Sequence, residues 1–294
     1  MFGGSIVALV TPMHEDGSLD LEALGRLVDF HAGAGTAAVV IAGTTGESPC
    51  ISAAELDTML RTALEAAAGR ISVIAGTGSN ATAHAVELTR VAARAGAAAA
   101  LVVTPYYNKP TQQGLFLHYH AVARDGGLPV ILYNVPGRTA CDLLPETVAR
   151  LAEVEGIVGI KEAVPGTERV ARLRELLGDR LDLLSGDDAT AMDFLLAGGD
   201  GVISVTANVA PRLMHGMVEA ARHGEPRKAE ALNDRLAGLH RALFVEPNPI
   251  PVKWVVMHMG LIGAGIRLPL TPLDPVHYDE VRAAMLRAGV EYTS

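Results

Sequence analysis

Short apolar runs alternate with longer amphipathic segments along most of this chain. Runs of this kind, bounded by glycine or polar residues, are typical of strands that are buried on both faces of a parallel sheet. The runs end near Val10, Ala42, Ala75, Thr104, Asn134, Lys161, Ser185 and Ser204. The segments between them have helical spacing and cover residues 19–34, 52–68, 81–95, 112–123, 144–153, 168–177, 189–197 and 210–222.

Eight such strand–helix repeats predict an α/β protein with a (β/α)8 TIM barrel. The alternative is an open doubly wound sheet, which usually has fewer strands. Ser52 and Glu55 have the spacing of a capping box, and the pair Asp187-Asp188 has the position of a helix N-cap. After Arg222 the strand signals stop, and proline-rich turns separate three further helices. We therefore expect a barrel at residues 1–222 and a C-terminal helical region at residues 223–294.

Composition narrows the class of protein. The formal net charge is −9, which argues against nucleic acid and anionic membranes as main partners. The two cysteines, Cys50 and Cys141, match no metal-ligand spacing and predict a reducing compartment. The N-terminal apolar run stops at Thr11-Pro12 and is too short for a signal peptide or a membrane span. We expect a cytoplasmic protein without a membrane or nucleic-acid partner.

One predicted strand ends in a lysine. Residues 156–160 are an apolar run bounded by glycine, and Lys161-Glu162 follows it directly. A lysine at the end of a buried strand is partly desolvated, which favours its neutral amine, and a neutral amine can attack a carbonyl to form a Schiff base. The alternative is a structural lysine that is paired with Glu162 or with another carboxylate.

Polar residues follow several other predicted strands, and in a TIM barrel these strand ends form the active-site rim. They are residues 43–47 (Gly-Thr-Thr-Gly-Glu), 104–108 (Thr-Pro-Tyr-Tyr-Asn), 133–139 (Tyr-Asn-Val-Pro-Gly-Arg-Thr) and 185–188 (Ser-Gly-Asp-Asp). Residues 43–47 are either a plain turn or a backbone cradle for a carboxylate. Tyr133 is predicted to face Lys161 from the adjacent strand, where a phenol can transfer protons. Arg138 is either a surface ion-pair partner or a bidentate clamp for a substrate carboxylate.

Three other patterns are interpreted as structural. Gly76-Thr-Gly78 matches a loose dinucleotide-binding pattern, but no acidic residue ends the next strand. His118 and His120 are two apart on a helix and point in different directions, so they predict no metal site. Asp187-Asp188 is interpreted as a cap and not as a metal site.

Taken together, these blocks resemble the dihydrodipicolinate synthase (4-hydroxy-tetrahydrodipicolinate synthase) family of pyruvate-dependent class I aldolases. The resemblance covers essentially the whole chain. It is carried by residues 4–7, 43–47, 104–108, 133–136, 159–162, 184–188, 201–205 and 244–251. It implies condensation of pyruvate with L-aspartate 4-semialdehyde to 4-hydroxy-tetrahydrodipicolinate, in diaminopimelate and lysine biosynthesis, without a cofactor or a metal.

The resemblance also implies roles for individual residues. Lys161 forms the Schiff base with pyruvate, and Tyr133 donates and accepts protons. Thr44 links Tyr133 to Tyr107, which reaches in from a neighbouring subunit across the tight dimer interface of a homotetramer, a dimer of dimers. The substrate-binding set consists of Thr45 for the pyruvate carboxylate, Arg138 for the semialdehyde carboxylate, and Gly186 and Ile203 as main-chain walls.

Two alternative functions remain open from the sequence. One is a sibling aldolase that acts on a sugar acid, such as an N-acetylneuraminate lyase or a 2-keto-3-deoxy acid aldolase. The neuraminate lyases generally lack an arginine at the position of Arg138. The other is a barrel that binds a ligand without catalysis, for which the retained set of lysine, tyrosines and threonine has no purpose.

The chain departs from the family in one place. Members that lysine inhibits hold it in an interface pocket, typically with histidines at positions 53 and 56 and a glutamate at 84. Here those positions are Ala53, Leu56 and His84, so the counter-charge for an amino group is lost. The remnant of the pocket consists of Ser48, Asn80, His84 and Tyr106. We expect weak or absent feedback by lysine.

Overall fold

The predicted strands form a closed parallel barrel in the computed structural model, which describes residues 2–292. They are β1 (Gly4–Ala8), β2 (Ala38–Ile41), β3 (Ser72–Gly76), β4 (Ala99–Val103), β5 (Val130–Asn134), β6 (Ile157–Glu162), β7 (Asp182–Ser185) and β8 (Gly201–Ser204). Neighbours in the chain are neighbours in the barrel, and β8 closes on β1 with Gly201 opposite Gly4. The predicted TIM barrel is confirmed, and the open doubly wound sheet is wrong.

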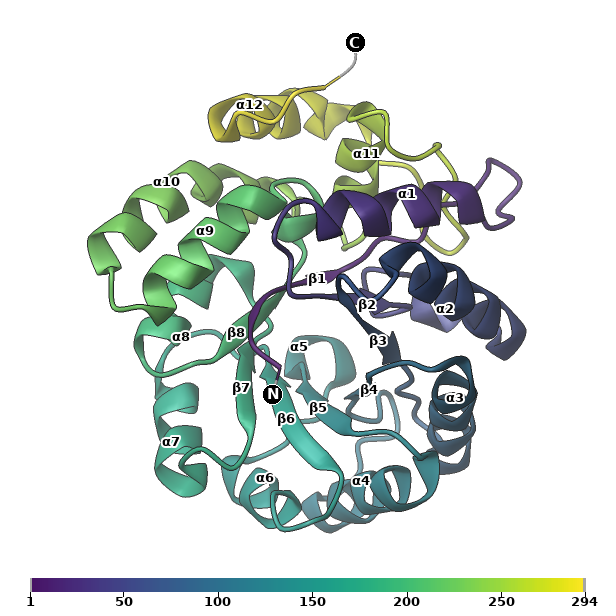
Figure 1. The fold of residues 1–294 in the computed structure, drawn as a ribbon, viewed down its shortest axis with the longest axis vertical. Coiled ribbons are helices and arrows are strands. Elements are labelled where there is room, and N and C mark those ends of the chain that lie inside the picture. The colour runs from purple at the N-terminus through teal and green to yellow at the C-terminus, as the bar shows by residue number, and fades with distance from the viewer. Residues whose placement is uncertain (1, 293–294) are drawn as a thin grey trace.

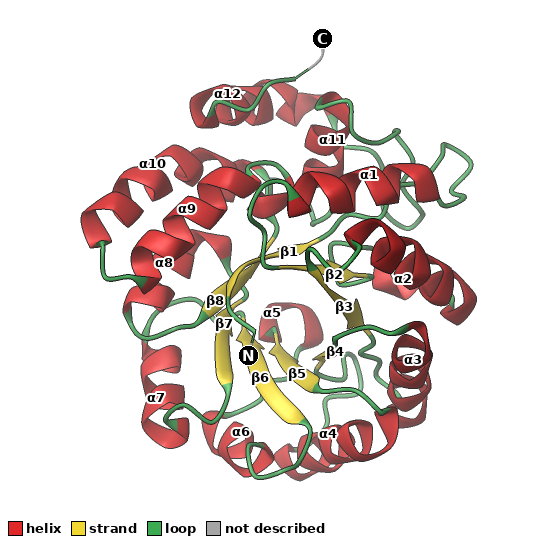
Figure 2. Ribbon diagram, in the orientation of Figure 1, coloured by secondary structure: helices red, strands yellow, loops and turns green. Residues whose placement is uncertain are grey.

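Helices surround the strands as a ring (Figures 1 and 2). They are α1 (Leu21–Ala32), α2 (Ala53–Ala67), α3 (Thr82–Ala95), α4 (Gln112–Gly126), α5 (Pro136–Thr139), α6 (Pro145–Leu151), α7 (Glu168–Leu177), α8 (Ala191–Leu196), α9 (Pro211–Arg222), α10 (Pro226–Ala242), α11 (Ile250–His258) and α12 (Tyr278–Ala288). Four 3-10 turns accompany them: η1 (Ser48–Cys50), η2 (Asp188–Thr190), η3 (Thr206–Asn208) and η4 (Pro275–His277).

The strands separate two kinds of core. Inside the barrel lies a small cluster that includes Ile6, Ile74 and Ile203. Outside it, larger clusters fill the space between the strands and the helices. Because successive side chains of a strand point to opposite faces, one strand supplies both cores. Both faces are therefore apolar, as the continuous hydrophobic runs predicted.

Local signals set the helix ends with some exceptions. Ser52 and Glu55 form the predicted capping box of α2. Asp187 does act as an N-cap, but of the 3-10 turn η2, because its side chain accepts from the Thr190 amide. Asp188 is not a cap: its carboxylate turns inward and accepts from the amides of Val205 and Thr206. The short helix α5, directly after β5, was not predicted.

The three helices predicted after Arg222 are present as α10, α11 and α12. Figure 1 shows them on the side of the barrel that carries α1 and α9. One continuous apolar cluster joins Leu27 of α1, Met217 of α9, Val255 of α11 and Met285 of α12. The division into a barrel, 1–222, and a helical region, 223–294, stays a prediction, and residues 1, 293 and 294 lie outside the described part.

Candidate active site

Lys161 lies inside the mouth of the barrel, at the end of β6. Its side chain is 5% exposed. Its Nζ lies 4.3 Å from the centroid of the Tyr133 ring, and the two residues are register partners on β6 and β5. The predicted facing of Tyr133 and Lys161 is therefore confirmed. An amine and a phenol meet in a space from which most water is excluded.

The alternative partner of Lys161 is absent from its surroundings. Glu162 points away from the barrel interior, and its carboxylate accepts hydrogen bonds from Asn134 and from the Val164 amide. Within residues 2–292 no carboxylate pairs with Lys161. The interpretation of Lys161 as one half of an ion pair is wrong, so its nitrogen is available for chemistry.

Burial has a large effect on Glu162. Its side chain is 1% exposed, and this desolvation raises the pKa of the carboxyl to about 7. Hydrogen bonds from Val164 and Asn134 and the charge of Arg169 oppose the rise. A carboxyl group is thus buried on the outer face of β6, the strand that also carries Lys161.

Of the two predicted main-chain walls, Gly186 lies close to the lysine. A Cβ added to Gly186 would come within 3.0 Å of Lys161 Cε and 2.8 Å of Ala163 Cβ, so the lysine fits only beside glycine. Ile203, in β8, is 1% exposed and packs in the inner cluster with Tyr133. Gly186 therefore borders the space around the amine, and the role of Ile203 as a wall stays a prediction.

The loop at residues 43–47 forms a turn in which two amides stay free. The amides of Gly46, Glu47 and Ser48 donate back to the carbonyls of Gly43 and Thr44. In the described chain this leaves the amides of Thr44 and Thr45 without a backbone acceptor. Those two adjacent donors are the part of the predicted cradle that remains open for an anion.

A cavity of about 230 Å³ opens beside this loop, and we call it the rim cavity. It is lined by Thr44, Ser48, Pro49, Val103, Tyr106, Val135, Arg138 and Thr139. Arg138 is exposed and extends from α5, and its Nη2 lies 3.4 Å from the Asn248 carbonyl oxygen. Within residues 2–292 it has no carboxylate partner, so the surface ion-pair alternative is wrong and the guanidinium faces the cavity.

Tyr107 is not part of this cavity. Its side chain is 89% exposed, and its backbone has φ +76°, a conformation that side chains rarely adopt. The predicted link from Thr44 to Tyr107 is therefore not made within one chain. Tyr106, beside it, turns inward and lines the cavity.

The predicted remnant of a lysine pocket is only partly assembled. Ser48 and Tyr106 line the rim cavity, whereas Asn80 and His84 do not. The Asn80 carbonyl accepts from Asn108, and His84 is exposed, 3.8 Å from Glu87. Position 56 faces the other way, because Leu56 is buried in the apolar core behind α2.

Sequence reasoning missed the contribution of the C-terminal region. Asn248 donates from Nδ2 to Thr45 Oγ1 at 3.1 Å, and both residues are buried. Lys253 of α11 donates to Glu47 Oε1 at 2.6 Å, and the Arg267 amide donates to Glu47 Oε2 at 3.0 Å. The available signal was Lys253 itself, a lone lysine within the apolar helix 250–257.

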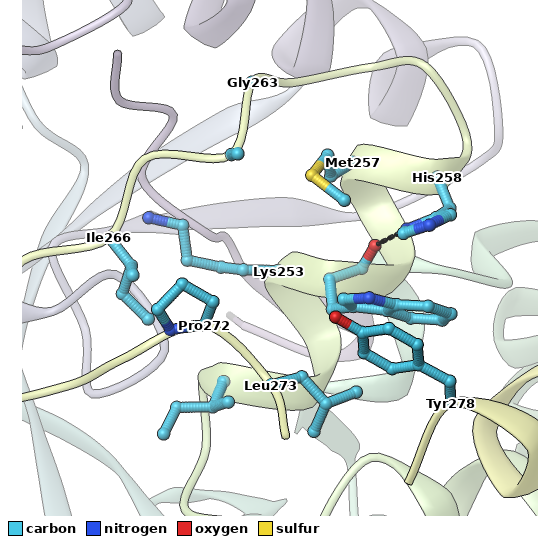
Figure 3. Close-up of a pocket in the computed structure, with 11 residues that line it drawn as sticks. Lys253, Met257, His258, Gly263, Ile266, Pro272, Leu273 and Tyr278 are labelled. Atoms are coloured by element: carbon cyan, nitrogen blue, oxygen red, sulfur yellow. Dashed lines mark hydrogen bonds between the residues drawn. The ribbon is translucent and has the colours of Figure 1, made fainter. Parts of the chain in front are cut away.

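Lys253 lines a second cavity, of about 360 Å³, together with Gly263, Ile266 and Pro272 (Figure 3). Burial lowers the pKa of Lys253, and the ion pair with Glu47 opposes that shift. The ion pair is nearly closed to water, since its side chains are 5% and 0% exposed. It holds the loop at residues 43–47 against α11.

The motifs interpreted as structural have structural explanations. A Cβ on Gly76 would lie 2.1 Å from the Ala42 carbonyl oxygen, and one on Gly78 would lie 2.4 Å from the Val103 amide nitrogen. These glycines allow neighbouring strand ends to approach closely. His118 is buried against Thr82, whereas His120 stacks on Phe116. Residues 2–292 contain no cluster of three metal-ligating side chains, and none of their helices is long and apolar enough to span a bilayer.

Comparison with known proteins agrees with this geometry. The profile of the dihydrodipicolinate synthetase family matches residues 1–288. The 4-hydroxy-tetrahydrodipicolinate synthase of Methylococcus capsulatus is 59% identical over 99% of this chain and 100% of its own length. The enzyme of that name from Nitrosococcus oceani is 58% identical over 97% of this chain and 98% of its own. The chloride-inhibited dihydrodipicolinate synthase of Acinetobacter baumannii, solved in complex with pyruvate, superposes with a TM-score of 0.97 at 49% identity, covering 99% and 100% of the two chains.

Proposed function

Because the chain belongs to the dihydrodipicolinate synthetase family, we infer that it is a Schiff-base-forming carbon–carbon lyase. It condenses pyruvate with L-aspartate 4-semialdehyde to 4-hydroxy-tetrahydrodipicolinate, in diaminopimelate and lysine biosynthesis. The observation that carries this conclusion is the buried, unpaired Lys161 Nζ at 4.3 Å from the Tyr133 ring. A sugar-acid aldolase is not favoured, because relatives at 54–59% identity carry the synthase name.

The reaction begins at the amine. Lys161 Nζ attacks the keto carbon of pyruvate, and the carbinolamine loses water to give an imine. Tyr133 supplies the proton that converts the departing hydroxyl into water and takes it back in later steps. The open amides of Thr44 and Thr45 are placed to bind the pyruvate carboxylate, with Gly186 and Ile203 as walls.

Loss of a methyl proton then converts the imine to an enamine, since the imine nitrogen accepts the electron pair. The enamine carbon attacks the aldehyde carbon of the semialdehyde, and the aldehyde oxygen takes a proton. The amino group of the adduct attacks the imine carbon, closes the ring and releases Lys161. Because the lysine imine is the electron sink throughout, these steps require no cofactor.

Arg138 is proposed to bind the carboxylate of the semialdehyde. Support comes from its place in the wall of the rim cavity and its lack of a carboxylate partner within residues 2–292. A planar guanidinium makes two parallel hydrogen bonds to a carboxylate, which orients the aldehyde as well as binding it.

We also propose that the relay from Thr44 to Tyr107 forms between subunits of a homotetramer. The outward-pointing Tyr107 and its positive φ support this, because residues 2–292 of its own chain leave its side chain 89% exposed. The proposal places the enzyme in the cytoplasm, in keeping with its two free cysteines.

Weak or absent inhibition by lysine remains our proposal. It is supported by the exposed His84 and the buried Leu56, which offer no carboxylate to an amino group. A dose–response with L-lysine checks it, and strong inhibition at sub-millimolar concentration would contradict it.

Reductive trapping tests the proposed function. The protein is incubated with pyruvate, treated with borohydride, and analysed by intact mass and peptide mapping. We expect a single pyruvate-derived adduct on the peptide that carries Lys161. Lys161→Ala abolishes the adduct, whereas Lys228→Ala, at an exposed lysine, does not. The absence of an adduct, or an adduct on another lysine, would leave the non-catalytic barrel as the leading alternative.

A further inference from the structure

A second pair of register partners lies directly after the catalytic pair. Asn134 follows Tyr133 on β5, Glu162 follows Lys161 on β6, and Asn134 is the register partner of Glu162. Since side chains alternate along a strand, the second pair points outward when the first points into the barrel. Asn134 and Glu162 are 0% and 1% exposed, so this outer pair is sealed beneath the helix layer.

Hydrogen bonds join the outer pair across the two strands. Asn134 Nδ2 lies 3.0 and 3.1 Å from the two Glu162 carboxylate oxygens. The Val164 amide donates to Glu162 Oε1 at 2.9 Å, which fixes the chain just beyond β6. Both oxygens of the buried carboxylate are therefore satisfied, as a buried polar group requires.

The network extends to two further elements. Asn134 Nδ2 also lies 2.8 Å from Asp142 Oδ1, in the segment between α5 and α6, and Asn134 Oδ1 accepts from the Leu143 amide. Arg169 of α7 donates to Asp142 at 2.7 Å and lies 3.9 Å from Glu162. Helix, loop and two strands are thus tied together at one point, immediately behind Lys161 and Tyr133.

This point is where the sheet stops. Beyond Asn134 and Glu162 the ladder continues only through the Ala163 amide to the Asn134 carbonyl and the Gly186 amide to the Glu162 carbonyl. The catalytic pair occupies the next-to-last positions of its strands, close to the ends where strands fray most easily. Proton transfer between a phenol and an enamine tolerates little error, and a displacement of about 1 Å costs roughly 100-fold in rate.

We propose that Glu162, acting with Asn134, is a positioning residue that fixes the height and rotation of Lys161 relative to Tyr133 for proton transfer. Glu162 does not touch the substrate, because its side chain points away from the barrel interior. This inference rests on the proposed Schiff-base function. It adds that the Glu162 carboxylate fixes the backbone of β6 and thereby the position of the Lys161 side chain.

The test separates proton transfer from pyruvate binding. Pyruvate is incubated with the enzyme in deuterium oxide, and loss of the methyl proton signal by NMR reports formation of the enamine without the second substrate. For Glu162→Gln, whose amide presents hydrogens to Asn134, we expect exchange and kcat to fall at least about tenfold. KM for pyruvate stays within about twofold, because the loop at residues 43–47 is untouched.

Three further variants complete the design. Glu162→Asp keeps the carboxyl group and is expected to recover part of the exchange rate. Glu146→Gln makes the same change on the exposed face of α6, where the carboxylate pairs with Arg172, and leaves exchange at the wild-type rate. Asn134→Ser removes the same cross-strand bond from the other side and gives the same split between kcat and KM.

The outcomes distinguish failure of the proposed function from failure of the positioning role of Glu162. If the wild-type protein forms no trapped adduct on Lys161, the proposed function fails. If the adduct forms and Glu162→Gln exchanges methyl protons at the wild-type rate, only the positioning role is overturned. Failure of both Glu162→Gln and Asn134→Ser to fold would also overturn it, because the network would then serve stability alone.

Discussion

Replacing Lys253 by methionine removes the ammonium that neutralises Glu47 and keeps a side chain of similar length. In the wild type, Glu47 Oε1 accepts from Lys253 at 2.6 Å and Oε2 accepts from the Arg267 amide at 3.0 Å. The variant keeps the second bond and loses the first together with its charge. Methionine fills irregular apolar space well, so the wall of the adjoining cavity stays occupied (Figure 3).

The expected loss of stability is large because the ion pair is buried. Its side chains are 5% and 0% exposed, so the carboxylate that remains has almost no access to water. Removing one partner of a buried pair costs about 3–5 kcal/mol. The same substitution at Lys228, whose pair with Glu225 is 65% and 48% exposed, is expected to cost far less, because solvent screens an exposed pair.

Urea unfolding at one fixed protein concentration measures both variants, because an oligomer's apparent stability depends on concentration. Pyruvate kinetics add a second readout: displacement of the loop at residues 43–47 raises KM for pyruvate in Lys253→Met and not in Lys228→Met. The double variant Glu47→Gln with Lys253→Met recovers part of the stability, since no charge is left buried. A loss in Lys253→Met no greater than that in Lys228→Met would refute the reasoning.

Three further predictions concern the rim, the subunit contact and the buried acid. Arg138→Ala leaves the borohydride-trapped pyruvate adduct intact. It weakens binding of the semialdehyde by the free energy of a charged hydrogen bond, about 1.5–3 kcal/mol, which steady-state kinetics detect as a higher KM for the semialdehyde. An unchanged KM for the semialdehyde would remove Arg138 from the site. Tyr107→Phe lowers kcat while the adduct still forms, and full turnover would show that the relay is wrongly assigned. The pKa of Glu162 is raised from 4.5 to about 7 in the folded protein, so its stabilising contribution is complete below pH 4.5 and is lost as pH rises through 7. Relative to Glu162→Gln, the unfolding free energy of the wild type is therefore expected to fall by about 3 kcal/mol between about pH 4 and pH 8, and a constant difference across that range would contradict the assigned burial.

The barrel was predictable because its strands are buried on both faces. A run such as residues 156–160 has no polar face, and eight such runs at regular spacing leave few other architectures. The facing of Lys161 and Tyr133 followed from the same regularity, since both residues lie near the ends of neighbouring parallel strands. Strand periodicity therefore gave both the fold and the centre of the candidate site.

Contacts between distant parts of the chain were not predictable in the same way. The pairing of Lys253 with Glu47 joins residues 206 positions apart and leaves no periodic trace in the sequence. The alternative that paired Lys161 with Glu162 was wrong because it considered only their adjacency in the sequence. Successive side chains of a strand point to opposite faces, so Glu162 points away from Lys161. Asp188 was misread for a related reason, since its acceptor role depends on amides at the end of β8.

The single tryptophan of the chain lies in the C-terminal region, where Trp254 packs between His258 and Tyr278 at ring-centroid distances of 3.8 and 4.8 Å. Its side chain belongs to the residue that follows Lys253, so any loosening of α11 around the Glu47 ion pair changes the surroundings of the indole. Intrinsic tryptophan fluorescence therefore reports on the surroundings of α11, while circular dichroism averages over all the helices. Recorded together during unfolding, the two signals reveal whether α11, which contacts the loop at residues 43–47, separates before the barrel opens.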